Sequence, residues 1–222
     1  MNTPANPSHS TASLGSLALA AAASLGVILG FIVVDLAIFA EGASFKREGG
    51  GLETASAVLY LVAAGVFFRH VPAQLWGALF HIPALMLLFA AREADFDKAF
   101  TQSGILSLRF YSGDSSLMAK MIGGAFAVFA VYVICRVLWQ GLPAALRALK
   151  AKEVWPWFAV LAAVLVAGTK SIDGLGRKLL DFGIVISKDL DQTAALVEEV
   201  GEAFIPVCAI LAILARWKGR DQ

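Results

Sequence analysis

Three glutamates lie on adjacent turns of one apolar segment near the carboxyl end of the chain. Glu198, Glu199 and Glu202 form the run EEVGE. Side chains three or four residues apart share a face of a helix, so Glu202 points the same way as both of the others. Carboxylates gathered on one face can bind a proton or a cation, or can act as a general base. The run therefore predicts a carboxylate site.

Glu202 is predicted to lie deeper in this segment than the other two glutamates. It precedes Arg216, at the end of the apolar run, by 14 residues, which is about 21 Å along a helix axis. The hydrocarbon core of a bilayer is about 30 Å thick, so we expect Glu202 to lie inside the membrane. Pro206 has no N–H to donate to the carbonyl of Glu202, four residues earlier. We therefore place the centre of the site at Glu202.

Ionisable residues in other apolar segments are predicted to reach a similar depth. We expect Glu53 and Lys170 to approach Glu202 within one polar cluster. A charge inside a membrane is costly unless it is paired or hydrated, so such residues are functional candidates. The alternative is a set of salt bridges that only holds the bundle together. The candidate polar-site residues are Glu53, Arg92, Glu93, Asp95, Lys170, Asp173, Glu198, Glu199 and Glu202, with Asp35 and His81 as secondary candidates.

The candidate cofactor is a divalent metal, but the sequence leaves its presence unknown. Carboxylate oxygens suit Mg, Ca or Mn. If a metal binds, Glu53, Glu198 and Glu202 are the candidate ligands. The chain carries no nucleotide-binding motif and none of the common hydrolase motifs, so no catalytic residue is assigned.

Hydropathy predicts the helices that must position these residues. The chain of 222 residues is 59% hydrophobic and 16% charged, whereas soluble domains are about 45–50% apolar and about 25% charged. Long continuous apolar runs favour helices over a transmembrane barrel. We predict an all-α polytopic transmembrane bundle of about six helices, with amphipathic interfacial segments in the connections 92–115 and 171–194. The expected helices lie near residues 14–40, 53–69, 73–94, 116–139, 155–172 and 195–217.

Basic residues predict the orientation of the bundle. Six helices place both termini on the same side of the membrane. Outside the two long connections, most of the basic residues lie at segment ends on that side. Such an excess of basic residues marks the cytoplasmic side. We therefore expect a multi-pass protein of the plasma (inner) membrane. Residues 1–13 are predicted to be a disordered cytoplasmic tail and residues 218–222 a short cytoplasmic tail. The basic residues on that side include Arg136, Arg147, Lys150, Lys152, Arg216, Lys218 and Arg220.

These features lead to one main functional hypothesis and two alternatives. We expect an integral membrane protein whose carboxylate-rich site, near the extracytoplasmic face, handles a cation, a proton or a small polar solute. The alternatives are a membrane-embedded enzyme acting on a lipid or lipid-linked substrate and an assembly subunit of a membrane complex. The expected partners are the lipid bilayer and either a second copy of the chain or a larger complex. The net charge of +1 and the lack of a basic domain argue against nucleic acid.

Overall fold

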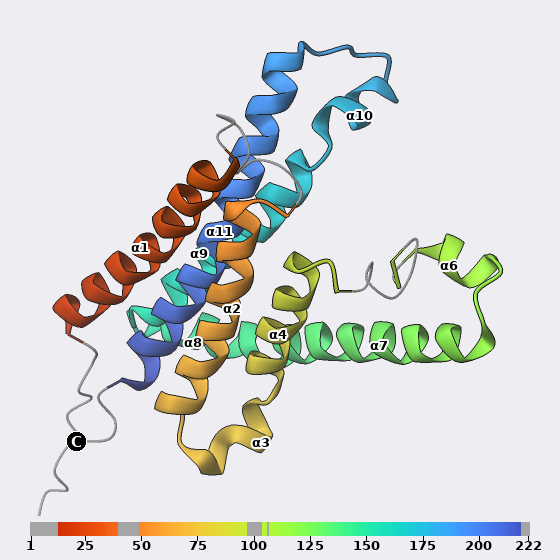
Figure 1. Ribbon diagram of the computed structural model, residues 1–222. Coiled ribbons are helices and arrows are strands. Elements are labelled where there is room, and N and C mark those ends of the chain that lie inside the picture. Colours follow the sequence, from red (N-terminus) through yellow and green to blue (C-terminus); the bar gives the residue numbers. More distant parts are fainter. Residues whose placement is uncertain (1–12, 40–48, 97–103, 106, 219–222) are drawn as a thin grey trace, which may run out of the picture.

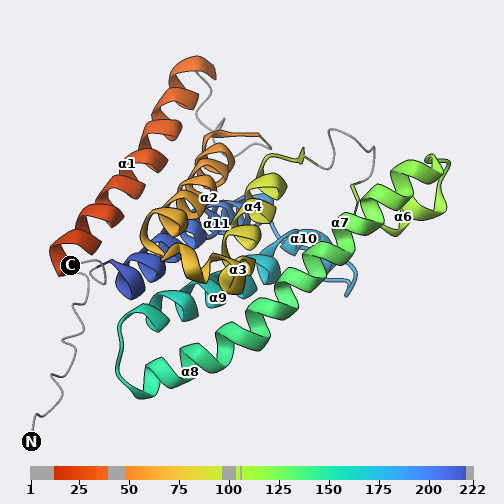
Figure 2. The same cartoon turned by 90° about the horizontal axis from the view of Figure 1, so that it is seen from below.

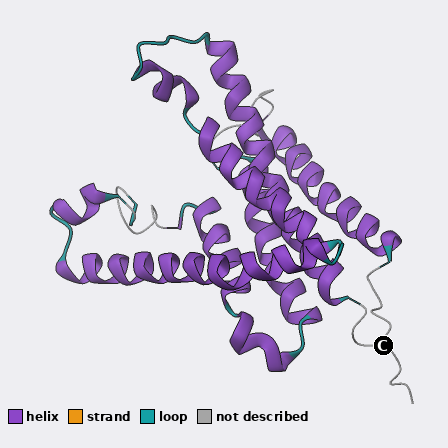
Figure 3. Cartoon of the chain, turned by 180° about the vertical axis from the view of Figure 1, so that it is seen from behind, coloured by secondary structure: helices purple, strands orange, loops and turns teal. Residues whose placement is uncertain are grey.

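A computed structural model describes residues 13–39, 49–96, 104–105 and 107–218. These residues form helices joined by turns and loops, and Figure 3 shows no strand among them. The prediction of an all-α fold is thus confirmed. Apart from Ser13 and Lys218, the two predicted tails lie outside the described residues, as do residues 97–103 and 106 of the first long connection.

Four helices pack side by side and carry the core. They are α1 (Leu14–Phe39), α2 (Gly51–His70), α9 (Trp155–Ile172) and α11 (Lys188–Trp217) (Figures 1 and 2). α11 packs against α2 and α9, and α1 packs against α2 and α11. Side chains such as Leu59 and Phe67 of α2 are almost completely buried, because this helix has neighbours on several faces.

Four helices of the described chain are long and apolar enough to cross a membrane. They are α1, α2, α9 and the continuous helix Leu117–Lys150. A bent pair of helices over residues 73–93 brings the number to five. The chain is therefore a membrane protein by its helices, but six spans are not confirmed. α11, which contains the predicted segment 195–217, is not among these helices, and its first half carries Lys188, Asp189 and Asp191 as well as the EEVGE run.

The predicted continuous helix over residues 73–94 is wrong, because the structure breaks it. A 3-10 turn η2 (Ala73–Leu75) and the short helix α3 (Trp76–Leu79) are followed by α4 (His81–Glu93), at an angle of 64°. Pro83 explains the position of the break, since it has no N–H to donate to the carbonyl of Leu79 and its ring clashes with that carbonyl. α4 packs against α2.

The helix predicted over residues 116–139 is longer in the structure. α7 (Leu117–Arg136) continues through a π-helical turn, η3 (Val137–Gly141), into α8 (Leu142–Lys150). α7 packs against α4 and extends away from the four-helix group (Figure 1). The long connections contain the short helices α6 (Leu108–Ser112) and α10 (Leu175–Leu180), and α11 begins seven residues before the predicted segment.

Antiparallel packing brings the charged ends of several helices together. α2 and α11 begin, and α4 and α9 end, at the same end of the bundle (upper part of Figure 1). At the opposite end, the Arg216 guanidinium of α11 lies over the Trp155 ring at the start of α9, 4.5 Å from the ring centre. This contact fixes the register of the two helices, so the last turn of α9 lies beside Glu202 of α11.

Candidate functional site

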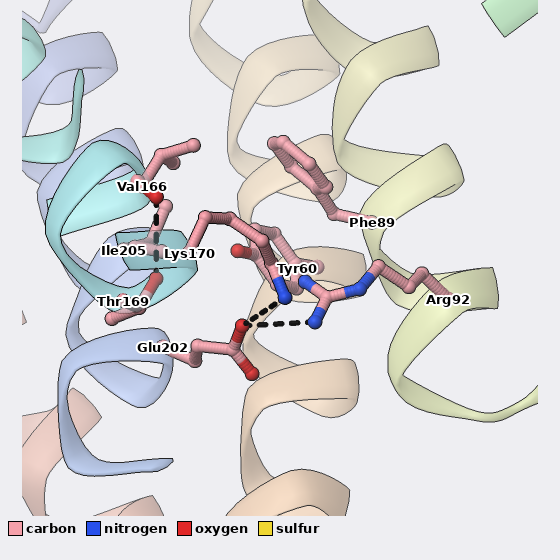
Figure 4. Close-up of a pocket in the computed structure, with 8 residues that line it drawn as sticks. All are labelled: Tyr60, Phe89, Arg92, Val166, Thr169, Lys170, Glu202 and Ile205. Atoms are coloured by element: carbon pink, nitrogen blue, oxygen red, sulfur yellow. Dashed lines mark hydrogen bonds and ion pairs between the residues drawn. The ribbon is translucent and has the colours of Figure 1, made fainter. Parts of the chain in front are cut away.

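One carboxylate is shared by two cations at the charged end of the bundle. Oε1 of Glu202 lies 2.9 Å from Nη2 of Arg92 and 3.4 Å from Nζ of Lys170. Figure 4 shows the two cationic side chains reaching it, one from α4 and the other from α9. The Glu202 side chain is 12% exposed, against 45% for Arg92 and 44% for Lys170. The predicted approach of Lys170 to Glu202 is therefore present.

Close backbone packing places Lys170 beside Glu202. A Cβ atom on Gly201 would lie 2.6 Å from the Cγ2 methyl of Thr169, which is too close for two carbons. Only glycine allows α9 and α11 to approach this closely at that level. Since Lys170 follows Thr169 and Glu202 follows Gly201, this contact sets the distance between the two charged groups.

Glu93 is the most buried carboxylate of this region. Its side chain is 4% exposed, and its Oε1 lies 3.3 Å from Nη1 of Arg92. The geometry does not make a hydrogen bond, so Oε1 has no hydrogen-bond partner. The Glu93 carboxylate interacts electrostatically with those of Glu202 and Glu53. Buried polar atoms without a partner are rare in proteins, and each requires an explanation.

Three further candidates lie at the edge of this cluster. Nζ of Lys170 also lies 3.2 Å from Oδ2 of Asp173, just beyond the end of α9. Burial tends to raise the pKa of Asp173, but the hydrogen bond and the positive charge of Lys170 outweigh it and hold this pKa below its usual value. Glu198 interacts electrostatically with Asp173 and Glu202, and Glu199 interacts with Glu202 as well.

Glu53 occupies the first turn of α2. Its carboxylate accepts a hydrogen bond from the backbone N–H of Gly49, and it interacts electrostatically with Glu93 and Glu199. The structure therefore places Glu53 near the carboxylates of Glu93 and Glu199. Asp95 follows the last turn of α4 with φ of 46°, a left-handed conformation that Asp tolerates and that ends the helix.

The two secondary candidates lie in other surroundings. Asp35 is buried on α1, where the backbone of Gly51 approaches it closely, and its Oδ2 has no hydrogen-bond partner. His81 is also buried, and its Nδ1 accepts a hydrogen bond of 3.3 Å from Nε of Arg136. His81 therefore belongs to a contact between α4 and α7. Arg136 was expected at a cytoplasmic helix end, but it lies inside the continuous helix Leu117–Lys150.

The proposed metal ligands do not form a metal-binding group. Within the described part of the chain, no cluster of three or more His, Cys, Asp or Glu side chains is arranged to hold a metal ion. Glu53, Glu198 and Glu202 do not form such a cluster, so the conditional metal site stays a prediction. The physical reason is that the Glu202 carboxylate is occupied by Arg92 and Lys170.

A pocket of about 390 Å³ lies beside the three charged side chains (Figure 4). Sequence reasoning missed five residues of its lining, although each lies one or two helical turns from a predicted residue or directly beside one. Tyr60 is seven residues after Glu53, and Phe89 is three residues before Arg92. Helical spacing from the predicted residues would have found them. The lining residues are Tyr60, Phe89, Arg92, Val166, Thr169, Lys170, Glu202 and Ile205.

The cluster thus combines hydrogen-bond donors, a carboxylate shared by two cations and a buried carboxylate oxygen without a hydrogen-bond donor. Comparison of the chain with protein-family models, curated proteins and solved structures found no match.

Proposed function

We propose that this membrane protein takes up protons at its carboxylate-rich cluster. Glu53, Glu93, Glu199 and Glu202 interact with one another there, and Arg92 and Lys170 are the cations in contact with Glu202. Ionisation of all four carboxylates would place several negative charges close together. Such crowding is costly in a membrane, and protons are the simplest groups that relieve it.

The observation that carries this proposal is the buried Oε1 of Glu93, which receives no hydrogen bond although Nη1 of Arg92 lies 3.3 Å away. A buried ionised carboxylate oxygen needs a donor, and this atom has none. A proton on Glu93 removes the charge and supplies a donor to the same group. The cluster then resembles the proton-binding carboxylates of membrane transporters in its chemistry, since these also lie inside helix bundles.

The proposal includes a topology. We place α11 across the membrane as the last of six helices, with its charged first half toward the extracytoplasmic side. Both termini then lie in the cytoplasm, and the protein is a multi-pass protein of the inner membrane. The basic residues near the opposite end of the bundle, such as Arg147, Lys150 and Lys152, support this orientation.

Infrared spectroscopy of the purified protein tests the proton on Glu93. At neutral pH we expect the carbonyl stretch of a protonated carboxylic acid, and we expect it to disappear in Glu93→Gln. The amide of glutamine imitates the neutral acid in shape, so this variant should fold as the unchanged protein does. Asp189→Asn, at an exposed position on the first turn of α11, is the control and should leave the band intact.

Two results would contradict the proposal. One is a spectrum of the unchanged protein without any protonated carboxyl band. The other is a band that persists in Glu93→Gln, which would place the proton on a different residue. A proton flux into liposomes that is lost in Glu93→Gln and kept in Asp189→Asn would extend the result from proton binding to proton transport.

A second candidate function, membership of a larger membrane assembly, is favoured by α7. Of the residues described in this helix, Gly123 and Val133 are buried, while Met118, Val128 and Val131 are largely exposed. A helix with so little cover in its own chain has a face free for a second copy or another membrane protein. Native mass spectrometry of the protein in micelles tests this, since a single chain at all concentrations would reject the homo-oligomer.

A further inference from the structure

The pocket lies in a groove between α4 and α9. α4 packs against α2, and α9 packs against α11, so the central helices supply the floor. Phe89 comes from α4, Val166 from α9 and Ile205 from α11, and these side chains make one part of the lining apolar. Arg92 and Lys170 reach across the groove at its charged end (Figure 4). The groove therefore has an apolar part and a cationic end.

The lining carries more positive than negative charge. Arg92 and Lys170 contribute two cations, and Glu202 contributes one carboxylate. Both cations keep almost half of their side-chain surface exposed, whereas Glu202 is largely buried between them. An anionic oxygen group is the complement of two converging cations, and a guanidinium binds carboxylates and phosphates in a forked geometry. An apolar tail is the complement of Phe89, Val166 and Ile205.

A neighbouring segment favours a ligand that arrives from the membrane. α10 carries Arg177 and Lys178, and Nζ of Lys178 donates a hydrogen bond of 2.9 Å to the backbone carbonyl of Lys170. Phe182 and Val185, which follow α10, are each 82% exposed. Basic residues beside exposed apolar ones are typical of segments that lie at a membrane surface with anionic lipids.

We propose that the groove binds an amphiphile through its anionic head, a carboxylate or a phosphate, held between Arg92 and Lys170 in place of Glu202. The apolar tail lies against Phe89, Val166 and Ile205. The volume of about 390 Å³ is in the usual range of small-molecule sites, so it holds the head and the adjoining part of the tail.

Displacement of Glu202 links this ligand to protons, a step that rests on the proposed function. Once the ligand has taken both cations, the Glu202 carboxylate has lost its two cationic partners and remains close to the carboxylates of Glu93, Glu198 and Glu199. One proton is then taken up with each anion. The charged and titratable groups that interact with Glu202 are Tyr60 from α2, Arg92 and Glu93 from α4, Lys170 from α9, and Glu198 and Glu199 from α11 itself. Glu53 and Asp173 interact with members of this set.

Calorimetric titration of the full chain in uncharged detergent tests the site. The probes are octanoate, octyl phosphate, octyltrimethylammonium and inorganic phosphate. We expect the first two to bind, and their relative affinity distinguishes a carboxylate head from a phosphate head. Lys170→Met should weaken binding by about tenfold or more, because one charged hydrogen bond is lost. Lys170→Arg should largely keep it, and the exposed control Lys188→Met should leave it unchanged.

The Glu202→Gln variant tests whether the ligand displaces the Glu202 carboxylate or whether Glu202 has only a structural role. The neutral amide competes less well for Arg92 and Lys170, so octanoate or octyl phosphate should bind this variant at least as tightly as the unchanged protein. Titration in two buffers of different ionisation enthalpy measures proton uptake, which should be about one per anion in the unchanged protein. This uptake should be lost in Glu202→Gln.

Several results would overturn the inference. Equal binding of octyltrimethylammonium, unchanged binding in Lys170→Met, or weaker binding in Glu202→Gln would each reject the anion site. Inorganic phosphate that binds as tightly as octyl phosphate would reject the amphiphile, and anion binding without proton uptake would reject the coupling. Failure of the proposed function would have a different signature. The infrared band of Glu93 would be absent, while binding that depends on Lys170 would still be observed.

Discussion

Replacement of Glu202 by leucine is expected to destabilise the protein by about 3 kcal/mol, the lower end of the range for breaking a buried ion pair. The physical reason is that one largely buried carboxylate neutralises both Arg92 and Lys170. Lys170 keeps a second carboxylate, that of Asp173, and this moderates the loss. Unfolding of the protein in mixed micelles with increasing sodium dodecyl sulfate, followed by circular dichroism, measures the effect.

Asp173→Asn is the matched control for this experiment. Lys170 contacts Asp173 as it contacts Glu202, but both members of that pair are 44% exposed. Exposed ion pairs contribute about 0–1 kcal/mol. If Glu202→Leu and Asp173→Asn had equal effects, Glu202 would not be the centre of the cluster. Glu202→Gln should fall between the two, because the amide keeps an acceptor for Arg92.

Gly201→Ala is expected to destabilise the bundle by about 1–3 kcal/mol, the usual cost of overpacking. The added methyl would lie 2.6 Å from Cγ2 of Thr169. The Thr169 methyl cannot easily move, because the Thr169 side chain is branched and its hydroxyl donates a hydrogen bond to the backbone carbonyl of Val166. α9 must therefore move away from α11, and Lys170 moves with it away from Glu202. We expect octanoate binding to weaken together with stability.

A double-mutant cycle identifies the cause of that loss. Thr169→Ser removes the Cγ2 methyl and keeps the hydroxyl, so Thr169→Ser combined with Gly201→Ala should recover most of the stability. Gly168→Ala, on α9 next to Thr169, is the control. No atom lies within 4 Å of the position that its Cβ would take. Alanine is a better helix former than glycine, so this control should be neutral or stabilising. Without recovery in the double variant, the close contact would not be the cause.

The charged cluster could largely be predicted from the sequence, because depth follows from counting residues. Glu202 lies 14 residues before Arg216, and Lys170 lies 15 residues after Trp155. Each distance along the helix axis follows from the rise per residue. Antiparallel neighbours must bring such residues to one level. The partner of each group could not be predicted in this way. Arg92 and Lys170 meet at Glu202 because of the rotation of α4 and α9 about their axes, and packing details such as Gly201 set this rotation.

The helix ends were less predictable where two signals compete. A proline such as Pro83 disfavours a continuous helix, yet the apolar run continues through it, and hydropathy alone favoured one helix. Arg136 indicated a helix end, yet the structure continues the helix to Lys150. The arginine is accommodated because its guanidinium is paired within the chain, lying 5.2 Å from the centre of the Phe80 ring as well as against His81. The mean hydropathy of a sequence segment contains no information about such a partner.

The pairing of Arg136 has a consequence for how the protein reaches its membrane. Nη2 of Arg136 donates to the backbone carbonyl of Ala78, beside the break between α3 and α4. Released into lipid alone, the Leu117–Lys150 helix would expose a guanidinium, and the Ala78 carbonyl beside the break would lose this donor. Each segment supplies what the other lacks. We therefore expect the earlier segment to depend on its contact with the later one for stable insertion into the bilayer.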